Sequence, residues 1–189
     1  MLKRLLKIVG IGVLVSSLIG CETATIIDLY HAKTEKLKMT DEVFKDSAYD
    51  SYIVGGVFIK PYMVQSTFGE SSTEYSRYTL YLGAYRKEDN SNPVVLNHIK
   101  VIGENDVIFK EINKEINLPL EFSDDKNRPS FHSSDDLLIE ETNNYDMKLT
   151  ENSVISVLIN VTVEVNGEKI TKDLTYDFTT RFRTYNVTR

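Results

Sequence analysis

The amino-acid sequence predicts an all-β protein in which two antiparallel sheets pack against each other as a sandwich. Three observations support this prediction. A long hairpin pattern lies near the C-terminus, several shorter segments alternate apolar and polar residues, and few segments have the spacing of apolar residues that a helix needs.

The hairpin pattern runs from residue 153 to residue 183 and is divided by Asn166-Gly167. Before this dipeptide, apolar residues occupy every second position: Ile155, Val157, Ile159, Val161, Val163 and Val165. After it, the alternation continues, with Lys172 as the one charged interruption, at Ile170, Leu174, Tyr176, Phe178 and Phe182. Strict alternation is typical of a strand with one buried face, and Asn-Gly favours a two-residue type I′ turn.

The turn also predicts the register of the hairpin. It makes Val165 and Glu168 direct neighbours, so that Ile155 faces Phe178 and the alternating apolar residues lie on one face. We expect Lys172 near a sheet edge, where its stem can pack and its ammonium group can reach water. A two-stranded ribbon is not stable alone, so the rest of the chain must supply a second layer.

The first 21 residues have the features of an export signal. They begin with a basic group made of Lys3, Arg4 and Lys7. The apolar stretch that follows, residues 8–19, is short for a transmembrane helix. It ends in Leu18-Ile19-Gly20-Cys21, and Cys21 is the one cysteine of the chain. This segment resembles the lipobox of bacterial lipoprotein precursors, in which a branched apolar residue, a variable residue and a small residue precede the lipidated cysteine. An ordinary secretory signal with a chance cysteine, or a short membrane anchor, are the alternatives.

The resemblance, which covers residues 1–21 alone, implies that residues 1–20 are cleaved and that Cys21 is acylated. The lipid bilayer is then one partner of the chain, because two or more acyl chains give stable anchoring. In Gram-negative lipoproteins an aspartate after the cysteine resembles an inner-membrane retention signal, whereas this chain has Glu22. We therefore expect the periplasmic face of the outer membrane there, or the outer side of the plasma membrane in a Gram-positive cell.

Charge and cysteine content limit the partners of the mature chain. Loss of the three basic residues of the signal changes the formal charge from −6 to −9. Such an acidic chain argues against binding to nucleic acid or to anionic lipid through a basic patch. With Cys21 acylated, no cysteine remains for a disulfide, so stability must come from packing.

The mature chain divides into two parts. Residues 21–50 are expected to be the lipidated cysteine and a loosely held tether, with a candidate first strand at residues 24–30 and a candidate helical turn at residues 41–45. Residues 51–189 are expected to be a single β-sandwich domain.

Further strands are predicted within this domain. Residues 52–64 read as a strand with a bulge or bend at Gly55-Gly56 and with Pro61 at an edge. The other candidate strands are residues 75–87, 94–102, 106–112, 113–122 and 137–141, and residues 143–152 are expected to be a loop. About seven to nine strands at short spacing fit an immunoglobulin-like sandwich best, and a small closed β-barrel is the alternative.

The strand at residues 75–87 carries an aromatic outer face with Tyr75, Tyr81 and Tyr85. Packing of tyrosines across neighbouring strands is one explanation. A binding face is the other, because tyrosine combines a large contact area with a polar tip and is enriched at interfaces.

The longest polar stretch, residues 123–136, suggests a metal site at first sight. Its possible donors are Asp124, Asp125, His132, Asp135 and Asp136. Adjacent aspartates do not readily converge on one ion, and the spacings of an EF-hand and of H-E-x-x-H are absent. We therefore expect a solvated loop and no metal site.

The sequence contains no recognisable catalytic constellation. His31, His98 and His132 lie in unrelated segments, and the G-x-S-x-G pattern of hydrolases is absent. We therefore expect a protein that is not an enzyme and has no cofactor.

Three functions are compatible with these features. The leading one is a membrane-anchored, non-enzymatic protein of the cell envelope that binds another protein, whose identity the sequence does not reveal. The second is a carrier or sensor of a small hydrophobic or sugar ligand, which needs a concave site. The third is an envelope hydrolase, since a pair of catalytic carboxylates has no signature among 28 acidic residues.

Overall fold

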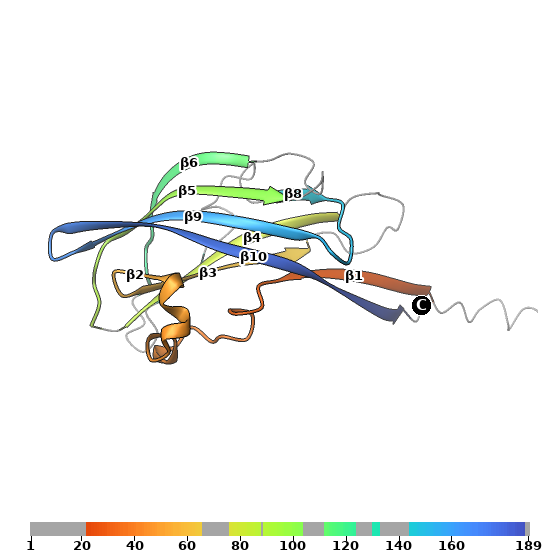
Figure 1. Ribbon diagram of the computed structural model, residues 1–189, viewed down its shortest axis with the longest axis horizontal. Helices are drawn as coiled ribbons and strands as arrows, with labels where there is room; N and C mark the ends of the chain where they lie inside the picture. The colour runs from red at the N-terminus through yellow and green to blue at the C-terminus, as the bar shows by residue number, and fades with distance from the viewer. Residues whose placement is uncertain are drawn as a thin grey trace, which may run out of the picture.

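The computed structural model describes residues 22–65, 76–87, 89–103, 112–123, 130–132 and 144–187. In these residues two antiparallel sheets pack against each other, and they form no closed barrel (Figure 1). The prediction of an all-β, immunoglobulin-like two-sheet sandwich is therefore confirmed. Within the same residues no helix is long and apolar enough to cross a membrane.

One sheet, sheet A, contains the long hairpin. Its strand order is β1-β10-β9-β5-β6. The strands are β1 (Glu22–Tyr30), β10 (Glu168–Val187), β9 (Val154–Val165), β5 (Val94–Gly103) and β6 (Ile112–Pro119). Pro119 lies in β6, at the edge of the sheet in the described residues, which suits a proline because it has no N–H to donate to a neighbour.

The other sheet, sheet B, has the order β2-β3-β4-β7, and β8 also pairs with β4. The strands are β2 (Ile53–Val54), β3 (Val57–Gln65), β4 (Ser76–Arg86), β7 (Ser130–His132) and β8 (Asn144–Met147). Among the described residues, β2 pairs only with Val57 and Phe58, so with respect to these residues the part of β3 from Ile59 onward has a free edge. Pro61 lies on that free edge, as predicted.

The Gly55-Gly56 dipeptide is a turn between two strands rather than a bulge within one. Both glycines have positive φ angles, 54° and 76°, and they join β2 to β3. A Cβ atom on Gly55 would lie 2.6 Å from Cγ1 of Val163, so this turn also allows sheet B to approach sheet A closely.

Two other predictions in the middle of the chain were wrong. Residues 144–147 form strand β8 and not part of a loop, and Met147 is fully buried beside β4. Residues 130–132, inside the polar stretch, pair with β4 as β7. The predicted strands at residues 106–111 and 137–141 lie outside the described residues.

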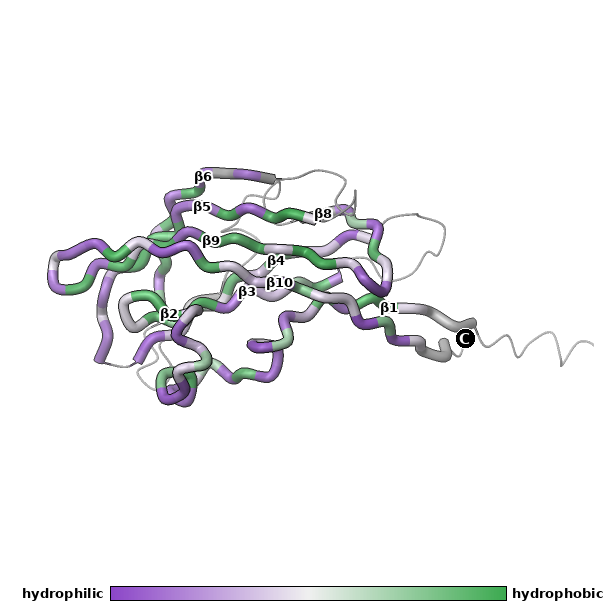
Figure 2. The backbone as a smooth tube through the Cα atoms, viewed as in Figure 1, coloured by the Kyte–Doolittle hydropathy of each residue, from purple (hydrophilic) through white to green (hydrophobic). Residues whose placement is uncertain are grey.

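The predicted hairpin register is confirmed along its whole length. Val165 pairs with Glu168 and Ile155 pairs with Phe178, while Asn166 and Gly167 have positive φ angles of 52° and 83°. The inner faces of β9 and β10 are buried, and Figure 2 shows the alternation of hydrophobic and hydrophilic residues along β9 and β5.

Two apolar residues of the hairpin pattern are exposed, which the sequence does not predict. Ile170, near the turn, is 43% exposed, and Phe182, near the other end of β10, is 38% exposed. Both lie where β10 extends beyond the core, since the hairpin turn and the paired ends of β1 and β10 are at opposite ends of the molecule (Figure 1).

Residues 31–50 are packed against the sandwich, unlike the loosely held tether that the sequence suggests. The candidate first strand is β1, which pairs with the last part of β10. Two short 3-10 helices follow, η1 (Asp41–Phe44), near the predicted turn, and η2 (Ser47–Tyr52). His31, Thr34 and Val43 are buried, because this segment covers one edge of the sandwich.

Two buried tyrosines join the sheets through their hydroxyl groups. Tyr176 of sheet A donates to the carbonyl oxygen of Ile59 in β3 at 2.6 Å. Tyr78 of sheet B donates to the carbonyl oxygen of Ile27 in β1 at 2.7 Å. Each bond supplies a donor to a backbone carbonyl oxygen of the opposite sheet.

Candidate functional site

The candidate interaction face on β4 is only partly accessible. Tyr85 is buried, its hydroxyl donates to Oδ1 of Asp41 at 2.8 Å, and its ring stacks on Phe44 at 5.9 Å. η1 therefore covers this residue. Tyr81 is half-buried and stacks on Tyr62 of β3, with ring centroids 5.2 Å apart.

The remaining site residues named from the sequence are not all described. Cys21 and Tyr75 lie outside the described residues, as do the four aspartates of the polar stretch, and His132 is described as part of β7 through its backbone alone. In the described parts of the chain no three His, Cys, Asp or Glu side chains are grouped as a metal site would need.

A groove that the sequence does not predict lies where the two sheets meet. There β1, the edge strand of sheet A, runs beside the free edge of β3 in sheet B. The groove has a volume of about 810 Å³. Ligand sites in proteins have volumes of about 300–1,000 Å³, so it is large enough for a small molecule.

Apolar side chains supply most of the groove surface, and they come from four segments. They include Leu37, Met39, Pro61, Met63, Val64 and Phe178. Val64 is 44% exposed, which is unusual for a large apolar side chain on this molecule. Tyr30 and Tyr62 add aromatic rings to the same surface.

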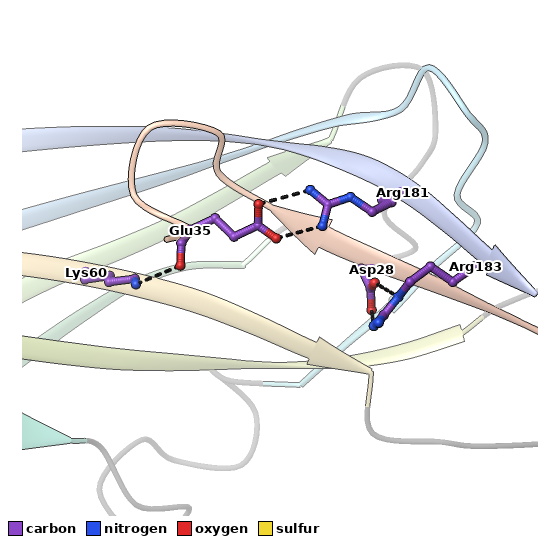
Figure 3. A network of polar contacts seen from close by, with 5 residues as sticks. All are labelled: Asp28, Glu35, Lys60, Arg181 and Arg183. Atoms are coloured by element: carbon purple, nitrogen blue, oxygen red, sulfur yellow. Dashed lines mark hydrogen bonds and ion pairs between the residues drawn. The ribbon is translucent and has the colours of Figure 1, made fainter. Parts of the chain in front are cut away.

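Two ion pairs line the groove (Figure 3). Arg181 donates from both terminal nitrogens to Glu35, at 2.8 and 3.0 Å, and its guanidinium group also lies 4.0 Å from the ring centroid of Tyr30. Arg183 donates to Asp28 at 2.7 Å. The bond from Arg181 holds the pKa of Glu35 below its usual value, so this carboxyl group is ionised at neutral pH.

Lys60 is the third cation of the groove, and its hydrogen-bond partners are backbone carbonyl groups instead of a carboxylate. Its Nζ donates to the backbone carbonyl oxygen of Leu37 at 2.8 Å. It also donates to the carbonyl oxygen of Glu35 at 3.3 Å (Figure 3). Within the described part of the chain, no carboxylate forms an ion pair with it. Burial lowers the pKa of Lys60, because a charged ammonium group loses hydration there.

His31 fixes the beginning of the segment that forms one wall of the groove. Its Nδ1 lies 2.9 Å from Oγ1 of Thr34, and its Nε2 lies 3.3 Å from the hydroxyl oxygen of Tyr52. Burial lowers the pKa of His31, so the neutral ring is favoured. These buried polar contacts therefore hold this wall of the groove in place.

The groove offers binding chemistry more readily than acid–base chemistry. Its two carboxylates, Asp28 and Glu35, each face an arginine. A general acid needs a raised pKa, whereas that of Glu35 is lowered.

Sequence reasoning missed the groove because its residues come from distant segments. One local signal was present: Lys60 is the one charged residue in the apolar run from Tyr52 to Val64. Arg181 and Arg183 also stand at alternate positions of β10, on the same face as Asp28 of the paired strand. Neither signal indicates by itself that β1 and β3 lie side by side.

Comparison with known proteins adds no functional information. No protein-family model matches the sequence, and no curated protein matches it. A crystal structure of a protein from Archaeoglobus fulgidus aligns with a TM-score of 0.31 and 8% identity, covering 68% of this chain and 95% of that chain. The class of protein is therefore defined by its own features, a β-sandwich with a groove at one edge.

Proposed function

We propose that this chain is a non-enzymatic binding protein of the bacterial cell envelope, held at a membrane by acyl chains on Cys21. The observation that supports the proposal is that the first strand of the fold begins next to the lipobox cysteine. Strand β1 begins at Glu22, directly after Cys21. The acylated residue would thus be joined to the edge of the sandwich without a flexible tether.

This junction supports a position of the groove close to the bilayer. The first groove residue of β1, Ile26, is five residues after Cys21. A strand rises about 3.3 Å per residue, so an extended chain would separate the two residues by about 17 Å. The headgroup layer on one side of a bilayer is about 5–8 Å thick, so the groove lies within reach of the membrane surface.

The location that we propose is the periplasmic face of the outer membrane if the cell is Gram-negative. Glu22 in place of aspartate supports it. The groove and the paired arginines support a binding role over a hydrolase, which would need one carboxyl group with a raised pKa.

Metabolic labelling with an alkyne analogue of palmitate tests the anchoring. The wild-type chain should incorporate label, and Cys21→Ser should incorporate none, because it lacks the sulfur atom that is acylated. Thr23→Ser, which leaves the lipobox intact, serves as the control. Equal labelling of wild type and Cys21→Ser contradicts the proposal.

A protein partner at the Tyr62–Tyr81 pair is the second candidate role. The stacked and partly accessible rings support it, since tyrosine is enriched in interfaces. A photo-crosslinking amino acid at position 81 in the natively expressed protein should trap a specific partner, whereas one at Thr175, on the outer face of sheet A, should not. Absence of any adduct at position 81 rejects this face.

A further inference from the structure

The groove combines an apolar surface with one cation whose charge is not neutralised by a carboxylate. Arg181 and Arg183 are matched by Glu35 and Asp28. Lys60 is the remaining charge, so the described groove residues carry a net positive charge on a chain that is acidic as a whole. An anion is the ligand that complements this charge.

Lys60 also has a donor available for such a ligand. An ammonium group has three N–H bonds, and the carbonyl oxygens of Leu37 and Glu35 account for two of them. These carbonyl groups fix the position of Nζ on the groove wall. Because burial disfavours the charged form of Lys60, an anion that replaces lost hydration gains more here than at an exposed lysine.

The surface around Lys60 favours an apolar chain. Met39, Met63 and Val64 line the same groove, and methionine side chains adapt to flexible apolar ligands. Sδ of Met39 would lie 3.1 Å from a Cβ atom at Gly83, so the absence of a side chain there lets Met39 lie against β4. The ligand class is therefore anionic at one end and apolar along the rest.

We propose that the groove binds a single-chain amphiphile with an anionic headgroup, taken from the membrane surface. Its headgroup accepts a hydrogen bond from Nζ of Lys60, and its chain lies against Met39, Met63 and Val64. The membrane as the source rests on the proposed anchoring through Cys21. The ligand chemistry rests on the groove alone.

Equilibrium binding of radiolabelled dodecanoate to the mature lipidated chain in nanodiscs tests the proposal, with partition into empty nanodiscs subtracted. Dodecanol, which has the same chain and no charge, is the matched probe. A hydrogen bond to a charged group favours the carboxylate by about tenfold or more. Affinity should also rise about two- to fourfold per methylene group from octanoate to dodecanoate, as an apolar contact along the chain requires.

Variants at Lys60 locate the binding. Lys60→Met keeps an unbranched side chain that is one atom shorter and should bind dodecanoate and dodecanol equally, whereas Lys60→Arg should retain the preference for the carboxylate. Lys169→Met, at an exposed position next to the hairpin turn, should bind as wild type. Circular dichroism and thermal unfolding of each variant verify that it is folded.

Three results would overturn the inference: no binding above that of empty nanodiscs, equal affinity of wild type for the two probes, or an unchanged carboxylate preference in Lys60→Met. None of them bears on acylation. Conversely, palmitate labelling of Cys21→Ser would reject the proposed anchoring while leaving the binding measurements valid.

Discussion

At the scale of single residues, buried hydroxyl groups connect the two sheets. Tyr176 and Tyr78 each reach a carbonyl oxygen on the edge of the opposite sheet. The alternation of the sequence indicates that Tyr176 is buried, but it does not indicate that the hydroxyl group of this residue forms a hydrogen bond. Which acceptor its hydroxyl meets depends on the packing of β3 against β10.

Tyr176→Phe should lower the free energy of unfolding by about 1–3 kcal/mol, because it leaves the carbonyl oxygen of Ile59 without a donor inside the core. Urea unfolding measures the change. Tyr49→Phe is the control, since Tyr49 is half-buried and its side chain forms no hydrogen bond with the residues that the structure describes, and it should change the stability by less than about 0.5 kcal/mol. Equal effects of the two substitutions would refute this role of Tyr176.

His31 gives the protein a pH dependence of stability. Burial lowers its pKa below the ordinary value of about 6.5, so the unfolded chain binds a proton before the folded chain does as the pH falls. The free energy of unfolding should therefore decrease from about pH 7 to pH 5. Chemical denaturation over this range should show a smaller decrease in His31→Gln, and an identical decrease would contradict this assignment.

At the scale of structural elements, glycine turns place the strands. Gly167 closes the β9–β10 hairpin, and no atom lies within 4 Å of the position of a Cβ there. Gly55 joins β2 to β3, and a Cβ there would meet Val163 of sheet A. The two positions share a positive φ but differ in their surroundings.

Substitution by alanine separates the cost of a positive φ angle from the cost of contact with Val163. Gly167→Ala should destabilise the protein by about 1 kcal/mol, the cost of a left-handed conformation for a residue with a Cβ atom. Gly55→Ala should cost at least about 1 kcal/mol more, because the added methyl group overpacks the core at Val163. Urea unfolding of both variants compares the costs, and equal values would mean that the contact with Val163 is unimportant.

Lys172 of β10 forms its side-chain hydrogen bonds with backbone groups that are far away in the sequence. The sequence places it on the inner face of the hairpin, and the structure confirms its pairing with Val161. Its ammonium group donates to the carbonyl oxygens of Asp50 and Ile53, at 2.9 and 3.0 Å. The charge therefore reaches backbone acceptors in η2 and β2, whereas the sequence predicts that it reaches water.

At the scale of the whole molecule, β10 sets the long dimension. It has 20 residues, so it extends about 60 Å from the hairpin turn to its pairing with β1 (Figure 1). The proposed acylation site lies next to the β1 end. The hairpin turn should therefore point away from the membrane.

Fluorescent labels on two cysteine variants test this orientation. Thr184→Cys lies on β10 opposite Thr25, near the N-terminal end of β1, and Asn166→Cys lies in the hairpin turn. With the lipidated protein in vesicles that contain spin-labelled lipids, the label at position 184 should be quenched and the label at position 166 should not. Equal quenching at both positions would contradict an upright arrangement on the bilayer.

The sequence by itself determined the all-β class, the hairpin with its register and the candidate acylation site, because each depends on residues that are neighbours along the chain. Period-two alternation and the Asn166-Gly167 turn act locally, so they need no knowledge of the fold. The residues between positions 31 and 50 lack such a pattern, and their packing was not predictable.

Only the tertiary structure decided where the groove lies and which charges meet in it. Lys60, Glu35 and Arg181 are far apart in the sequence, and they come together because the edge of β1 runs beside the free edge of β3. The burial of Tyr85 under η1 was decided in the same way. Contacts between strand edges depend on how two sheets pack, and no local pattern of side chains encodes that arrangement.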